Sequence, residues 1–162
     1  MPEKESIQKL LREIPDPEIP VINLEELGVI RDILIEGEKV EVVITPTYTG
    51  CPAMKVMEDD IVNKLHEHGI AEVKVTTVLS PAWTTDWIGE EAKEKLRQYG
   101  ISPPVHSTVN KAVLLGKAEK IVRCPRCHST RSKMINQFGS TPCKALYKCE
   151  DCLEAFDYFK CI

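Results

Sequence analysis

The sequence predicts an α+β protein in which a small three-stranded sheet with covering helices is followed by a small β zinc ribbon. Three observations lead to this fold class. Over about the first 100 residues, β-rich segments alternate with segments of helical periodicity. Two Cys-x-x-Cys pairs lie in the C-terminal quarter of the chain. The composition changes near 115–119, so we expect one domain at 1–115 and a second at 119–162.

The chain is expected to start with a helix and then a hairpin. Residues 6–14 carry apolar side chains at helical spacing, and Pro15 and Pro17 end this helix. Residues 29–35 and 40–45 are β-rich and are separated by Glu-Gly-Glu, which predicts two antiparallel strands with a tight turn.

The next elements continue the alternation. Residues 53–68 have one apolar stripe and are followed by Gly69, a typical left-handed helix end. Residues 73–79 form the expected third strand. A further amphipathic helix is predicted over 87–99, with a capping side chain at 84–86 and a second glycine stop after it. Residues 113–116 are a candidate edge strand of the first domain.

The charge distribution is uneven along the chain. The net charge is −4, but residues 1–118 hold 13 basic against 20 acidic side chains, whereas residues 119–162 hold 8 against 5. An acidic main body argues against a protein that binds nucleic acid over its whole surface. The sequence has no apolar run of membrane-spanning length and no secretory signal at its start, so we expect a soluble cytoplasmic protein.

The strongest chemical signal is a set of four cysteines, Cys124, Cys127, Cys149 and Cys152. Two residues between paired cysteines allow one tight turn to direct both sulfurs at one ion. Four protein ligands leave no open coordination position, so the spacing favours a structural Zn²⁺ site, with an iron-bearing site as the alternative. About 44 residues bury too little surface to fold alone, so the metal is expected to contribute folding free energy.

Two further cysteines, Cys143 and Cys161, are left over. We call each Cys-x-x-Cys turn a knuckle. If residues 144–148 and 155–160 form a hairpin around the second knuckle, these two thiols fall near each other. They could be buried small side chains, a redox pair or ligands for another group.

Cys51 follows a predicted strand and precedes a predicted helix that starts near Pro52. Free N–H groups and the helix dipole favour a thiolate there, which suits a metal ligand or a nucleophile, although a merely buried thiol is the alternative. A covalent mechanism would need a histidine base, and no histidine has an evident base geometry. We therefore expect transient metal or cluster handling, with Asp16 and Glu18 of the proline-rich loop as oxygen ligands or as supports of the Cys51 loop.

The segment 80–87 contains two tryptophans four residues apart. Its side chains could form a partner surface or a wall over Cys51, or they could anchor a loop in the core.

Several of these motifs carry a resemblance to known families. Asp16-Pro17-Glu18, the hairpin and residues 47–52 are similar to the small SufT-like domain family of iron–sulfur protein maturation. With residues 80–87, the ribbon and its flanking motifs at 138–144 and 156–161, nearly the whole chain resembles the PaaD family, whose members are accessory components of phenylacetyl-CoA epoxidase systems.

This resemblance implies a role in aerobic phenylacetate catabolism, where a multicomponent di-iron oxygenase epoxidises the ring of phenylacetyl-CoA. It implies a non-catalytic accessory component that assists iron or iron–sulfur centre assembly, with Cys51 contacting iron or a cluster beside Asp16 and Glu18. In agreement, the sequence has neither the ExxH helix pair of a di-iron site nor a Gly-rich dinucleotide fingerprint.

The expected partner is an iron–sulfur or di-iron client protein of the oxygenase system, with no membrane or nucleic acid, and a homodimer is left open. Two other functions remain as alternatives: an interaction or nucleic-acid-binding module built on the ribbon, and a thiol redox protein using Cys143 and Cys161.

Overall fold

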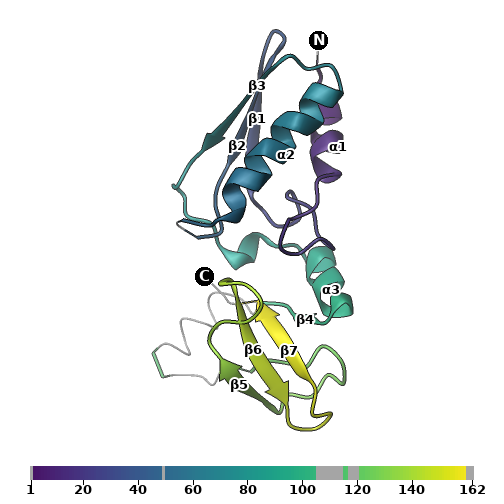
Figure 1. Cartoon of the computed structure of the whole chain (residues 1–162), viewed down its shortest axis with the longest axis vertical. Helices are drawn as coiled ribbons and strands as arrows, with labels where there is room; N and C mark the ends of the chain where they lie inside the picture. The colour runs from purple at the N-terminus through teal and green to yellow at the C-terminus, as the bar shows by residue number, and fades with distance from the viewer. Residues whose placement is uncertain (1, 49, 105–114, 117–120, 160–162) are drawn as a thin grey trace. The chain divides into compact units, whose positions relative to one another are not determined.

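The computed structural model describes residues 2–48, 50–104, 115–116 and 121–159. The chain forms two compact units, Met1–Trp83 and Thr84–Ile162, which are drawn in Figure 1. The domain boundary expected near 115–119 stays a prediction, because residues 117–119 lie outside the described residues.

The first unit contains a three-stranded sheet, as predicted, with strand order β1-β2-β3. Strands β1 and β2 are antiparallel, whereas β2 and β3 are parallel. Figure 1 shows α2 lying along the sheet with α1 beside it. The elements are α1 (Lys4–Arg12), β1 (Ile30–Glu36), β2 (Lys39–Ile44), α2 (Ala53–Glu67) and β3 (Glu72–Thr77).

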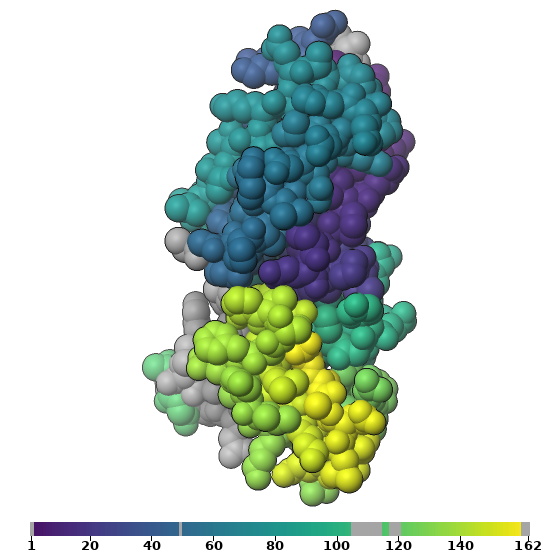
Figure 2. Space-filling model, in the orientation of Figure 1, coloured from purple at the N-terminus to yellow at the C-terminus, as the bar shows by residue number. Residues whose placement is uncertain are grey.

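The core of this unit lies between the central strand and the helices. Val40, Val42 and Ile44 alternate along β2 and are fully buried, which is the pattern of a strand with one face in the core. On α2, Ile61 and Leu65 lie on the same buried stripe. In the space-filling view, the opposite side of α2 forms part of the outer surface (Figure 2).

The predicted turn and helix end are confirmed. Gly37 in the β1–β2 turn and Gly69 after α2 have φ of 64° and 83°, conformations that side chains with a Cβ adopt at a cost. The amide of Ile70 then donates to the carbonyl of Leu65 and closes the helix end.

Trp83 is a core residue. Its side chain is 3% exposed, and its indole Nε1 donates to the carbonyl oxygen of Leu27 at 2.9 Å. This contact confirms the interpretation of Trp83 as a loop anchor.

The second unit contains a four-stranded sheet of order β4-β7-β6-β5. Its elements are η1 (Thr85–Trp87), α3 (Glu90–Tyr99), β4 (Ile101–Ser102), β5 (Ser132–Asn136), β6 (Lys144–Cys149) and β7 (Ala155–Phe159). The hairpin expected around the second knuckle is confirmed as β6–β7. The ribbon core is small and consists of Val122, Cys124, Ala145, Tyr147, Cys149, Phe156 and Tyr158.

The start of the helix predicted over 87–99 is wrong by three residues. The hydroxyl of Thr84 accepts from the amide of Asp86 and caps a separate 3₁₀ turn, and α3 begins only at Glu90 after Gly89. The predicted stop is correct, since Gly100 has φ of 93°.

Two further expectations cannot be placed. Residues 113–114 of the candidate edge strand lie outside the described residues, as does Cys161. No helix in the described ranges is long and apolar enough to span a bilayer.

Candidate metal centre and the Cys51 loop

The four predicted metal ligands converge in the second unit. Cys124 and Cys127 lie on a turn before β5, Cys149 ends β6, and Cys152 lies on the turn before β7. All four Sγ atoms lie within 4.8 Å of one another. Cys124 and Cys149 are fully buried, whereas Cys127 is exposed.

The spacing of the sulfurs suits a tetrahedral ion. Sγ of Cys124 is 3.7 Å from Sγ of Cys152, and Sγ of Cys127 is 3.5 Å from Sγ of Cys149. Zn–S bonds of about 2.3 Å in a tetrahedron place the sulfurs about 3.8 Å apart. The donor set therefore fits a four-coordinate Zn²⁺ centre with no open ligand position.

The two knuckles repeat the same backbone geometry. In each, the amide of the first cysteine donates to the carbonyl five residues later, at Ser129 and at Glu154. In each, the residue after the second cysteine is left-handed, with φ of 64° at His128 and at Leu153. Neither residue is glycine, so both knuckles hold a conformation that costs free energy.

The thiols differ in acidity without a metal ion. The backbone amide of Cys152 donates to Sγ of Cys149 and lowers the pKa of Cys149 to about 7. The backbone amide of Glu154 also lowers the pKa of Cys152, but burial and the neighbouring thiols outweigh it and raise that pKa to about 12. A bound divalent cation would favour the thiolate at every position, so metal binding releases protons.

Cys51 lies between β2 and α2, as predicted. Its side chain is 8% exposed, its amide donates to the carbonyl of Tyr48, and its carbonyl accepts from the amide of Met54. Helix α2 has no side-chain cap and no acidic residue in its first turn. The positive end of its dipole is therefore not neutralised by a local carboxylate next to the thiol.

Gly50 sets the approach to this cysteine. It has φ of 78°, yet an added Cβ would meet no atom within 4 Å. The glycine is therefore required for its backbone conformation and not for space.

Asp16 has a role inside its own loop. The residue is 3% exposed, and its Oδ1 accepts from the amides of Glu18 at 2.9 Å and Ile19 at 2.6 Å. The carboxylate thus fixes the turn between two prolines, and Glu18 on that turn is half-buried. A shared site of Cys51, Asp16 and Glu18 stays a prediction.

Cys143 is 6% exposed, and its Sγ lies 3.0 Å from the hydroxyl oxygen of Thr141. The predicted proximity to Cys161 lies outside the described residues.

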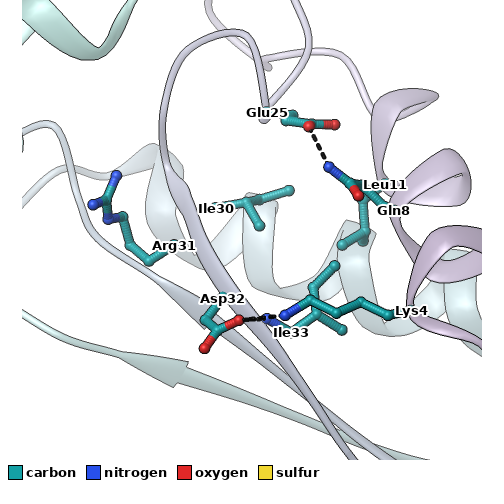
Figure 3. Close-up of a pocket in the computed structure, with 8 residues that line it drawn as sticks. All are labelled: Lys4, Gln8, Leu11, Glu25, Ile30, Arg31, Asp32 and Ile33. Carbon is teal, nitrogen blue, oxygen red and sulfur yellow. Dashed lines mark hydrogen bonds and ion pairs between the residues drawn. The ribbon is translucent and has the colours of Figure 1, made fainter.

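A crevice of about 170 Å³ separates α1 from β1 (Figure 3). Four of its polar side chains form two pairs: Lys4 pairs with Asp32 at 2.8 Å, and Gln8 donates to Glu25 at 2.7 Å. These internal pairs give the crevice a structural role at the α1–β1 contact.

Comparisons with known proteins divide the chain in the same way as its chemistry. Residues 4–80 match a family model described as iron–sulfur cluster assembly protein, and residues 108–160 match one described as PaaD zinc beta ribbon domain. The 3₁₀ turn and the left-handed residues of the two knuckles were not predicted, because no local sequence pattern indicates them.

Relatives extend over either the whole chain or its first part. The chain is 46% identical, over 99% of its length and 94% of the relative, to the putative D component of the 1,2-phenylacetyl-CoA epoxidase of Escherichia coli. It is 35% identical, over 57% of its length and 90% of the relative, to an Fe-S protein maturation auxiliary factor of Porphyromonas gingivalis. A crystal structure of a DUF59 domain of unknown function from Bacillus anthracis has 23% identity and a TM-score of 0.54, covering 57% of this chain and 90% of that one, which shows a shared fold.

Proposed function

The chain belongs to the family of the putative D component of 1,2-phenylacetyl-CoA epoxidase, and we propose that it assists iron or iron–sulfur centre assembly in a phenylacetyl-CoA ring-epoxidase complex. One observation carries this proposal: an iron–sulfur assembly domain and a four-cysteine ribbon are joined in a chain that matches this component over 99% of its length. The chain acts as an accessory protein and not as the oxygenase.

The two sulfur sites have different tasks in this proposal. The four ribbon sulfurs lie within 4.8 Å of one another, so an ion that they bind is fully ligated and holds a small core together. Cys51 belongs to the other unit and lies at the uncapped start of α2. Its single sulfur leaves the remaining positions of an iron ion open to other ligands.

Iron or a cluster is the cargo of the Cys51 site. As a thiolate, Cys51 binds the iron through Sγ, and delivery is a ligand exchange: the bond from iron to Sγ breaks while a ligand of the client protein forms its bond. No electron moves in this exchange, because the sulfur only gives up its bond to the iron. Asp16 holds the adjacent loop in shape, and Glu18 can add an oxygen ligand.

The client's metal content tests this proposal. A phenylacetate-degrading host would carry Cys51→Ser in place of the native gene, and its phenylacetyl-CoA epoxidase would be purified and analysed for iron. We expect the epoxidase to lose most of its iron, while the Cys51→Ser protein keeps its fold and its zinc.

Cys143→Ser is the matched control, because Cys143 is about as buried as Cys51 but lies in the ribbon unit. The control should leave the iron content of the epoxidase unchanged. A fully loaded epoxidase in the Cys51→Ser host would contradict the proposal.

A further inference from the structure

One edge of the ribbon sheet carries large apolar side chains that are exposed to solvent. Among the described residues, β5 is the last strand of its sheet and has a strand neighbour on one side only. Met134 and Ile135 on β5 are 51% and 54% exposed, and Phe138 in the following loop is 59% exposed. We call these three residues, with Lys133 and Lys148, the β5 patch.

The loop that carries Phe138 is held by hydrogen bonds on both sides. The amide of Phe138 donates to Oδ1 of Asn136 at 3.0 Å, and the hydroxyl of Ser140 donates to Oδ2 of Asp157 at 3.0 Å. The amide of Gly139 donates to a carbonyl of β6 at 2.7 Å. An aromatic side chain on such an ordered loop loses little backbone freedom when a partner covers it.

The patch also holds two like charges opposite each other. Lys133 of β5 and Lys148 of β6 are paired in register, and like charges in this position destabilise a sheet. Oε1 of Glu150 lies 3.7 Å from Nζ of Lys133, and both side chains are exposed, so this ion pair offsets the repulsion only weakly. A carboxylate placed next to the two lysines would offset this repulsion.

We propose that the β5 patch binds an extended segment of a partner protein. The segment adds a strand beside the regular part of β5, residues 132–134, places a carboxylate at Lys133 and Lys148, and covers the apolar side chains. This proposal rests on the proposed function in one respect: an accessory protein must bind the protein on which it acts.

Charge argues against two other occupants. A second copy of this chain would bring its own lysine pair against the first, and like charges in contact are unfavourable. A nucleic acid would bring a row of phosphates, but Arg131 is paired with Asp151 at 2.6 Å and Glu150 lies 3.7 Å from Lys133, so acidic groups lie among the basic ones. One carboxylate fits this surface better than a polyanion.

Selection from a library of random linear peptides, displayed against the zinc-loaded full chain, tests this inference. We expect enriched peptides that combine apolar and acidic residues and that shift the amide resonances of Ser132–Asn136. Lys148→Glu should weaken the binding of these peptides by about tenfold, because the attraction between the peptide carboxylate and residue 148 becomes a repulsion. Because that substitution replaces a repulsive cross-strand pair by an attractive one, the variant should fold at least as stably as the wild type.

Leu153→Asn is the matched control. Leu153 is 67% exposed on the same ribbon but outside the patch, and asparagine accepts its left-handed conformation. Peptide binding should be unchanged in this control. It should also be unchanged in Cys51→Ser, so that this test and the test of iron delivery can fail separately.

Four results would overturn the inference: enriched peptides without acidic residues, equal weakening by Lys148→Glu and Leu153→Asn, shifts of the β5 amides by a single-stranded DNA oligonucleotide at physiological salt, or a dimer that Ile135→Asp dissociates.

Discussion

Gly139→Ala should loosen the loop that presents the β5 patch. A Cβ at Gly139 would lie 2.4 Å from Oδ1 of Asp157 and 3.4 Å from the backbone of Ala145. Atoms at 2.4 Å overlap, so the carboxylate has to move and weaken its hydrogen bonds with the amide and hydroxyl of Ser140.

The magnitude follows from these contacts. Hydrogen bonds to a charged group contribute about 1.5–3 kcal/mol each, and the lower figure applies at an exposed site. Replacing glycine by alanine offsets about 0.5 kcal/mol of this through the unfolded chain. We expect a net loss of about 1–2 kcal/mol in the local opening free energy.

Hydrogen exchange of the β6 and β7 amides in the zinc-loaded protein measures this free energy. Asp157→Ala removes the clashing oxygen, so in that background Gly139→Ala should cost nothing or stabilise slightly. Gly89→Ala is a second control, since an added Cβ there meets no atom within 4 Å. An equal cost of Gly139→Ala with and without Asp157 would refute the steric explanation.

Three further predictions concern single contacts. Trp83→Phe removes the indole donor from the buried carbonyl of Leu27 and should lower the unfolding free energy by about 1–3 kcal/mol in urea denaturation; an unchanged midpoint would contradict the anchor role. Leu153→Gly removes the strain of a side chain on a left-handed backbone, so it should stabilise the ribbon against thermal unfolding by about 0.5–1 kcal/mol. A loss of stability would show instead that the leucine side chain packs against the ribbon. The hydrogen bond from Arg12 lowers the pKa of Glu25 in the folded protein. The pair therefore stabilises the fold fully above the pKa of glutamate in the unfolded chain, about 4.3, and this stabilisation is lost as the pH falls through the lower pKa of the folded state. Over this pH range, the melting temperature should fall less steeply with decreasing pH for Arg12→Gln than for the wild type. Identical pH profiles of the two proteins would argue against a stabilising pair of Arg12 and Glu25.

Local signals in the sequence predicted much of the fold. Apolar spacing and the glycine stops located α2 and the end of α3, and the Cys-x-x-Cys spacing predicted the four cysteines that the structure brings together. These features depend on residues close in sequence, where turn and helix chemistry dominates.

Other features depend on long-range contacts and were not predictable in this way. The pairing of β4 with β7 joins residues more than fifty positions apart. The turn at Asp16 is a local exception: Asp16 was expected as an oxygen ligand or loop support, and its carboxylate accepts from the amides two and three residues later in its own turn. The β5 patch was missed because its exposure depends on strand order, which the local sequence does not encode.

Metal and sulfide analysis of anaerobically purified protein tests the separation of the two sulfur sites most directly. The account predicts that Cys51→Ser keeps the wild-type zinc content and loses bound iron, whereas Cys124→Ser loses zinc. Iron that persists in Cys51→Ser, or that disappears only with Cys124→Ser, would contradict it.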